Sequence, residues 1–219
     1  LDLGTDALFA LAFEGHPYGL PALGTVDSLR ALRRKDLTGH HLDHVAQHNV
    51  VVAIVGDVDP DRALKRLAQA GANMPPQTRD PLAPMALAPM ERVRRRVIPR
   101  PERKTEVLLG FPGVAVRAPE RYAMEILTAV LTGQSGRLFT RLREDHGGVY
   151  DVDALSWEGL DAGLLIVSFA TSAERAPFCL DVFWQEVGRI LDAGLSDEEV
   201  ARAKQALVGG VEISFQRRG

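Results

Sequence analysis

Apolar positions in the first half of the chain recur mostly every three or four residues, the spacing of an amphipathic helix. The helices that this spacing predicts cover residues 1–14, 28–34, 36–48 and 61–70. The first of them should end at Gly15, because glycine is common just after a helix C-terminus. One stretch breaks the helical spacing: residues 50–55 read V-V-V-A-I-V. Six consecutive apolar, mostly β-branched residues have the length and composition of a buried strand.

The second half mixes the two spacings. Expected strands cover residues 105–111, 149–157 and 163–170, and the last two are separated by a connection of hairpin length. Expected helices cover residues 119–131, a short segment that stops at Gly147-Gly148, residues 176–193 and a last helix to about 215. Ser196 and Glu199 have the S-x-x-E spacing of a capping box before that last helix. Helices and mostly antiparallel strands therefore segregate, which predicts an α+β fold.

Between the halves, five prolines fall within residues 75–89 without sustained periodicity. Proline at this density continues neither a helix nor a central strand, so we expect an extended linker over 75–90. The linker divides the chain into a first segment, 1–74, and a second, 91–219. The arginine-rich stretch 92–98 that follows is read as an edge strand whose charges discourage unwanted pairing, with a patch that attracts acidic partners as the alternative.

Composition narrows the possible partners. The 219 residues are 46% apolar, enough for a sizeable core. The formal net charge of −3 gives no reason to expect nucleic acid, and no apolar run is long enough to cross a bilayer. The single cysteine, Cys179, excludes an internal disulfide and is expected to be a quiet buried thiol. Both ends look like the middle of a fold, which we interpret as a piece of a longer polypeptide.

One tract resembles a metal motif. His40, Asp43 and His44 form H-x-x-D-H, which places two imidazoles on one helical face with a carboxylate beside them. Against a zinc site, Asp is shorter than the usual Glu and no third ligand is evident. Leu37, Leu42 and Val45 also explain the segment as an ordinary amphipathic helix. We therefore expect no metal here, with a small zinc enzyme as the alternative.

Candidate chemistry is concentrated between Gly133 and Tyr150, which read G-Q-S-G-R-L-F-T-R-L-R-E-D-H-G-G-V-Y. Arg143 lies near the end of the expected short helix and Tyr150 at the start of the next strand, with a tight glycine turn between them. That layout lets a guanidinium and a phenol converge, and both can donate hydrogen bonds to a carbonyl. The alternative is a surface arginine near a helix end and a half-buried strand aromatic.

This segment resembles the second-repeat signature of the pitrilysin/insulinase-type zinc peptidases, the group that includes mitochondrial processing peptidase. The resemblance rests on S-x-R-L-F from Ser135, on L-R-E at 142–144, and on the seven-residue spacing from Arg143 to Tyr150. The turns His16-Pro17-Tyr18-Gly19 and G-D-V-D-P at 56–60 also match the family. The glycine pair departs from it, because family members often have a larger residue before the tyrosine.

The resemblance implies two related α/β repeats, with mostly antiparallel sheets and helices packed on one face. Residues 1–74 would be the end of the first repeat, and 91–219 most of the second. Arg143 and Tyr150 would bind the peptide substrate, while zinc, expected in the intact enzyme, would be held outside this chain. The partners implied are a peptide or protein substrate and the missing zinc-bearing repeat or a partner subunit, in a homo- or heterodimer. The alternative is a non-catalytic paralogue that binds peptides or scaffolds a partner.

Overall fold

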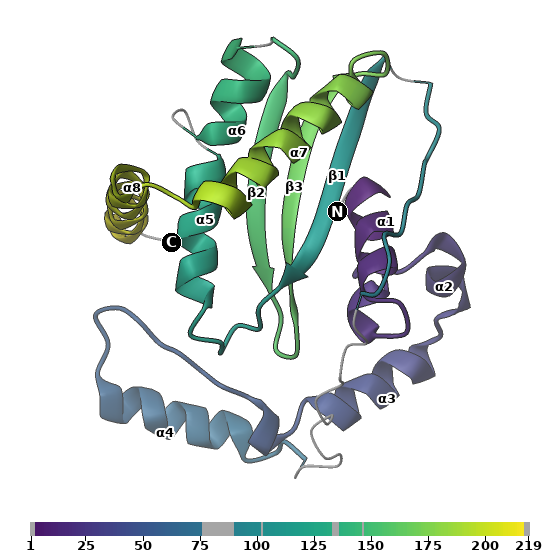
Figure 1. Ribbon diagram of the computed structural model, residues 1–219. Helices are drawn as coiled ribbons and strands as arrows, with labels where there is room; N and C mark the ends of the chain where they lie inside the picture. The colour runs from purple at the N-terminus through teal and green to yellow at the C-terminus, as the bar shows by residue number, and fades with distance from the viewer. Residues whose placement is uncertain (1–2, 76–89, 102, 133–135, 146, 217–219) are drawn as a thin grey trace. The chain divides into compact units, whose positions relative to one another are not determined.

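The computed structural model describes residues 3–75, 90–101, 103–132, 136–145 and 147–216, and it divides into two compact units (Figure 1). The sheet unit combines Leu1–Ala22 with Pro84–Gly219, and the helical unit is Leu23–Ala83. The predicted segments 1–74, 75–90 and 91–219 concern repeats of a larger protein and stay predictions. Residues 76–89 of the expected linker lie outside the described residues. In the described ranges, no helix combines the length and hydropathy that crossing a bilayer requires.

The sheet unit is built on three antiparallel strands, β1 (Lys104–Gly113), β2 (Asp151–Glu158) and β3 (Gly163–Ser172). Their order is β1-β3-β2, so the most apolar strand lies in the middle. Phe169 of β3 pairs with Val107 on one side and Val152 on the other. Since β2 and β3 form the expected hairpin and helices surround the sheet, the α+β prediction is confirmed (Figure 1).

Helices α5 (Arg121–Leu131), α6 (Arg137–Phe139) and α7 (Ala176–Ala193) cover one face of the sheet (Figure 1). A π-helical turn, η3 (Thr140–Asp145), follows α6 directly, and α8 (Asp197–Gln216) packs against α5. Every second side chain of a strand contacts these helices, because successive residues of a strand point to opposite faces of the sheet. The buried members of this core are Leu131, Leu138, Leu142, Val149, Val152, Val167, Phe169, Cys179, Val182 and Phe183.

The opposite face of the sheet is partly covered by α1 (Leu3–Ala12). Phe9 and Phe13 contact Trp157 with ring centroids 5.0 and 5.5 Å apart. After α1 the chain turns through η1 (Pro17–Gly19), where the Tyr18 hydroxyl accepts hydrogen bonds from the backbone N–H groups of Leu160 (2.8 Å) and Asp161 (3.3 Å). The H-P-Y-G turn thus binds the tip of the β2–β3 hairpin.

The helical unit contains α2 (Val26–Ala31), α3 (Arg34–His44), the 3₁₀ turn η2 (Gln47–Asn49) and α4 (Pro60–Gly71). Helix α2 begins with a capping box between Thr25 and Ser28. The Asp59 side chain caps α4, and Pro60 occupies its first turn. The Gln47 side chain donates to the carbonyls of Gly71 and Met74, which fixes the end of α4.

Two predicted strands are absent from the described residues. Residues 50–55 are irregular, and the side chains of Val51 and Val55 are 97% and 98% exposed. A strand needs a hydrogen-bonded neighbour, and in the described part of this unit none lies alongside. Residues 92–98 are irregular too. There the Arg94 guanidinium donates to the Leu11 carbonyl (2.7 Å) and pairs with Glu14 (3.2 Å), which fastens this connection to α1.

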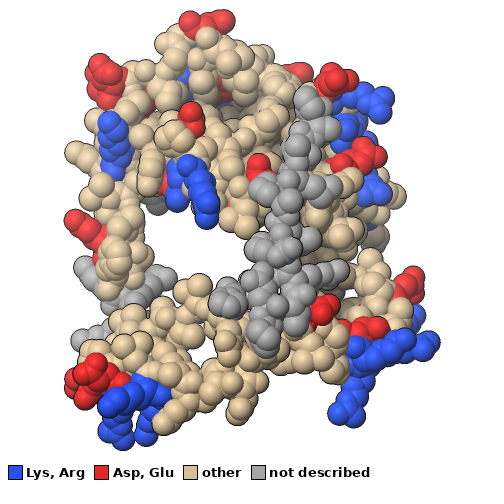
Figure 2. Space-filling view, turned by 90° about the horizontal axis from the view of Figure 1, so that it is seen from below, with Lys and Arg blue, Asp and Glu red and all other residues tan. Residues whose placement is uncertain are grey.

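On the face shown in Figure 2, charged side chains of both signs are present. Figure 2 shows one face, on which acidic and basic groups among the described residues are interspersed rather than collected into a large patch of one sign. This distribution agrees with the net charge of −3. Binding to a polyanion such as nucleic acid usually depends on a concentrated basic surface.

We predict that Tyr18→Phe lowers the free energy of unfolding by about 1 kcal/mol, because two backbone N–H groups lose their acceptor. Urea denaturation followed by tryptophan fluorescence measures the change. Tyr122→Phe is the matched control, since Tyr122 is 64% exposed on α5. Equal effects of the two substitutions would contradict a specific role for the Tyr18 hydroxyl.

Candidate functional site

The turn between η3 and β2 is shaped by Gly147 and Gly148. Gly147 has a φ of +54°, the left-handed conformation that glycine adopts at helix ends. Its N–H donates to the Arg143 carbonyl (2.9 Å), and the Gly148 N–H donates to the Leu142 carbonyl (2.8 Å). The predicted glycine C-cap is therefore confirmed, although the helix that it ends is π-helical. Single π-helical turns are frequent at functional sites.

Side chains from β3 and α7 hold this turn in place. The Gly148 carbonyl accepts hydrogen bonds from the Thr171 hydroxyl (2.5 Å) and the Cys179 thiol (3.4 Å), both fully buried. The Gly147 carbonyl accepts from the Arg175 guanidinium (2.6 Å). A Cβ atom on Gly148 would lie 3.0 Å from the Cys179 sulfur, so only glycine fits without movement. Cys179 is the buried thiol expected from the sequence, and it contacts the turn.

Arg143 and Tyr150 lie on either side of the turn. Arg143 belongs to η3 and is exposed, with its guanidinium carbon 5.1 Å from the centre of the Phe139 ring. A cation over an aromatic ring is attracted by the ring quadrupole, which restrains the arginine. Tyr150 precedes β2, donates its backbone N–H to the Ala170 carbonyl (2.7 Å), and is 67% exposed. Both groups are thus open to solvent, and their convergence on one substrate atom stays a prediction.

The histidine tract lies on α3, where the rings of His40 and His44 have centroids 4.3 Å apart. They share a helical face, as their spacing predicts. Within the described ranges, no group of three or more His, Cys, Asp or Glu side chains could hold a metal ion. The donor set present in these ranges therefore does not fit a three-ligand zinc site.

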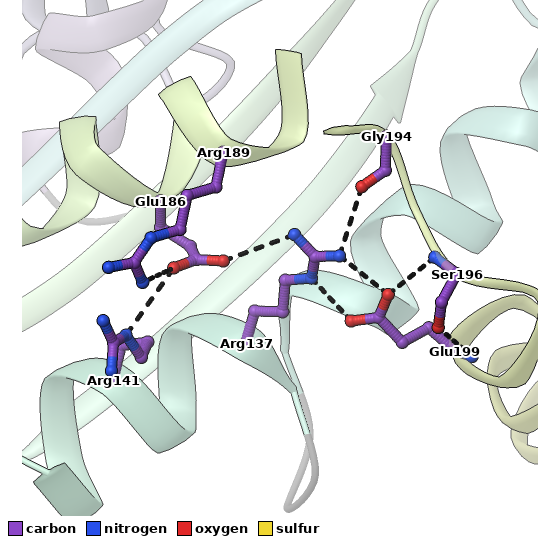
Figure 3. A network of polar contacts seen from close by, with 7 residues as sticks. All are labelled: Arg137, Arg141, Glu186, Arg189, Gly194, Ser196 and Glu199. Carbon is purple, nitrogen blue, oxygen red and sulfur yellow. Dashed lines mark hydrogen bonds and ion pairs between the residues drawn. The ribbon is translucent and has the colours of Figure 1, made fainter. Parts of the chain in front are cut away.

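Arg137 of α6 makes several polar contacts with α7, α8 and the segment between them, and the sequence alone assigned it no role. Its guanidinium forms a two-pronged pair with Glu199 of α8 (2.5 and 2.7 Å) and donates to the Gly194 carbonyl (3.2 Å) and Glu186 of α7 (3.4 Å) (Figure 3). Glu199 also accepts from the Ser196 N–H (2.8 Å), so the predicted capping box is confirmed. One guanidinium thereby ties α6 to both C-terminal helices.

Comparison with known proteins places this fold in a family. The model described as "Peptidase M16 inactive domain" matches residues 31–207. The chain belongs to the M16 peptidase family. This finding confirms the expected relationship to zinc peptidases of the processing-peptidase group.

Relatives of this M16 chain carry peptidase names. An uncharacterized zinc protease of Streptomyces coelicolor is 32% identical over 214 residues, which cover 94% of this chain and 46% of that protein. The mitochondrial-processing peptidase subunit beta of Lentinula edodes is 25% identical over 152 residues, or 63% of this chain and 32% of that protein. This M16 chain thus spans about half the length of the Streptomyces coelicolor relative. Its match covers about a third of the Lentinula edodes relative.

A solved structure shares the fold. The peptidase M16 inactive domain from Pseudomonas fluorescens superimposes with a TM-score of 0.81 at 24% identity, covering 96% of this chain and 51% of that one. The similarity extends over both units of this M16 chain. At this level of identity it shows the fold alone.

The stabilisation that the Arg137–Glu199 pair gives this M16 fold depends on pH. Hydrogen bonds from Arg137 lower the pKa of the Glu199 carboxyl to about 2, from an ordinary value of 4.5. Because the folded-state pKa lies below the unfolded one, the stabilisation is complete above pH 4.5 and is lost as the pH falls toward 2. The side chains are 20% and 16% exposed, so solvent screens the pair only in part.

We predict that Glu199→Gln destabilises the fold by roughly 2 kcal/mol at pH 7, and that the difference from wild type shrinks below pH 4.5. Urea denaturation at several pH values measures both quantities. Glu198→Gln, an exposed neighbour in the same first turn of α8, is the control. A difference that stays constant down to pH 2 would contradict the ion pair.

We also predict that Gly148→Ala destabilises the fold by about 1–3 kcal/mol, because the added methyl overpacks against Cys179. The cost should be smaller in a Cys179→Ala background, and a double-mutant cycle by thermal denaturation measures this coupling. Gly188→Ala in α7 is the control, because its Cβ would meet nothing within 4 Å. It should be neutral or slightly stabilising. Additive effects at 148 and 179 would refute the steric account.

Proposed function

We propose that this chain is the segment of an M16 zinc metalloendopeptidase that binds the peptide substrate and stabilises the oxyanion of the reaction. Arg143 and Tyr150 are the residues assigned to this role. The observation that carries the proposal is the anchored glycine turn, which connects the end of η3 to the start of β2 over a few residues. Both assigned side chains are exposed, as a substrate contact requires.

The proposed chemistry is hydrogen-bond donation to the scissile carbonyl. The Arg143 guanidinium keeps its charge at any working pH, and the Tyr150 phenol adds a neutral donor. As water attacks the carbonyl carbon, negative charge develops on the oxygen, and donors already in position stabilise that charge. The Phe139 ring beneath the guanidinium and the hydrogen bonds to Gly147 and Gly148 reduce the motion that binding would have to restrict.

Zinc would be held elsewhere in this proposal. The described part of the chain supplies no three-ligand set, whereas relatives are named zinc proteases. The metal, its ligands and the general base would therefore come from the rest of the protein or from a partner subunit. Zinc would activate the attacking water, and this chain's own groups would orient the substrate. Alone, the chain should not hydrolyse peptides.

A second function, from a different class, is a non-catalytic subunit that binds peptides or scaffolds a partner. The description of the matching family model as an inactive domain supports it, and so does the subunit name of the processing-peptidase relative. One sequence motif of the parent protein distinguishes the two functions. A catalytic parent carries H-x-x-E-H and a later glutamate in its zinc-bearing repeat, and a scaffolding paralogue lacks them.

We predict that Arg143→Ala in the intact, zinc-loaded protein lowers kcat by about 10²–10³-fold, the usual cost of losing one oxyanion donor. Zinc content, measured by metal analysis, should not change. Tyr150→Phe should lower kcat less, because a neutral donor contributes less than a charged one. Peptide-hydrolysis assays give kcat and KM.

Arg202→Ala on α8 and Tyr122→Phe on α5 are the matched controls, since both residues are exposed and lie outside the turn. Unchanged turnover in Arg143→Ala would remove the catalytic assignment. A parent that binds peptide through Arg143 but shows no hydrolysis with zinc bound would favour the scaffolding function instead.

A further inference from the structure

Residues 50–55 form an exposed apolar segment in the helical unit. We propose that this segment is an interaction surface, which inserts as a strand into a β-sheet of the parent protein outside this chain. The inference rests on one part of the proposed function, namely that the chain is a segment of a longer M16 protein. It does not require that protein to be a peptidase, because Arg143 and Tyr150 take no part in it.

All six side chains of the segment are exposed, although none of them is polar. The five larger ones, four valines and one isoleucine, have exposed fractions between 40% and 98%. Removing such apolar surface from water is favourable in proportion to its area. Scattered apolar side chains are normal on a protein surface, whereas contiguous apolar patches commonly mark interaction sites. The segment is contiguous, so it belongs to the second kind.

The helical unit does not bury the segment against its own helices. Among the described residues of this unit, only Ala46 is buried. Leu29 of α2, Leu37 of α3 and Leu64 of α4 are each more than half exposed. A domain is normally built from at least two layers of secondary structure around a core. The described part of this unit therefore lacks a layer that would close its core.

The backbone of the segment lacks partners too. Val50 has extended dihedral angles (φ −118°, ψ 127°), and within the described ranges no backbone hydrogen bond joins residues 50–55 to another segment. Both ends are held, since the Asn49 N–H donates to the Ala46 carbonyl (2.9 Å) and the Asp59 side chain caps α4. Once the segment is covered, its N–H and C=O groups need partners, which neighbouring strands supply.

The composition of the segment favours one kind of partner. An uninterrupted apolar run is typical of a strand covered on both faces, whereas a strand with one face in water alternates apolar and polar residues. Pairing of two copies through residues 50–55 would leave the other edge of each strand open. A sheet that already carries helices supplies neighbours and a covering layer. The chain spans 46% of the Streptomyces coelicolor relative, so a parent of that length has room for such a sheet.

Amide hydrogen exchange, compared between the intact parent protein and this chain alone, tests the proposal. In the chain alone, the amides of residues 51–55 should exchange nearly as fast as those of an unstructured peptide. In the intact protein we expect them to exchange about 100-fold more slowly or more, because an amide inside a sheet exchanges only after local unfolding. Residues 163–172 of β3 are the internal control, since they pair with β1 and β2 within this chain and should be protected in both proteins.

A substitution gives a second readout. Val51→Lys should lower the thermal midpoint of the intact protein by about 5 °C or more, because the added charge would be buried. The same change should leave the chain alone nearly unaffected, since Val51 is 97% exposed there. Gln69→Lys adds the same charge at an exposed polar position of α4 and should have little effect in either protein. If Val51→Lys prevents folding of the intact protein, Val51→Thr replaces it and should cause a smaller loss.

Equally fast exchange of residues 51–55 in the two proteins would overturn the interaction surface. Protection in the chain alone that grows with protein concentration would identify a second copy as the partner, and would overturn the proposed sheet. Neither measurement uses peptide hydrolysis, so its outcome is separate from that of Arg143→Ala. An intact protein that protects the segment without hydrolysing peptides would support the surface and count against the catalytic assignment.

Discussion

The carbonyl oxygen of Gly148 is the point on which the candidate site depends. It accepts hydrogen bonds from Thr171 on the central strand and from Cys179 on the covering helix. Both donors are fully buried, so breaking either contact would leave a polar group unsatisfied in the core. Sheet, helix and turn therefore have one consistent arrangement. Arg143 and Tyr150, which flank the turn, take their backbone positions from it.

The parts of the fold that sequence predicted well are those decided by neighbouring residues. Helix α7 covers Ala176–Ala193, the range that the sequence predicted. The β2–β3 hairpin and the Gly147-Gly148 cap also depend on local chemistry, and both form. The strand predicted at residues 50–55 does not form, because a strand depends on residues elsewhere in the chain as well as on its neighbours. A strand is completed only by a partner, and none lies beside it in the described part of that unit.

The site was predictable only in part, because its supporting contacts join distant positions. Arg143 and Tyr150 were found through a motif, whereas the central role of Arg137 was not. Its main partner, Glu199, lies 62 residues further along the chain. The Ser196–Glu199 capping box did mark that carboxylate, but nothing in one sequence pairs it with a particular arginine. Similarly, the hydrogen bond from the Leu160 N–H to Tyr18 spans 142 residues.

The packing of α1 against the sheet has a consequence for folding during synthesis. Helix α1 ends at Ala12, and the central strand that it covers begins at Gly163, about 150 residues later. A ribosome adds roughly 5–20 residues per second, so α1 waits on the order of ten seconds or more before its partner strand exists. During that time the apolar side of α1 can contact β1 but not the central strand. The nascent chain therefore passes through a stage in which part of that apolar side is still uncovered.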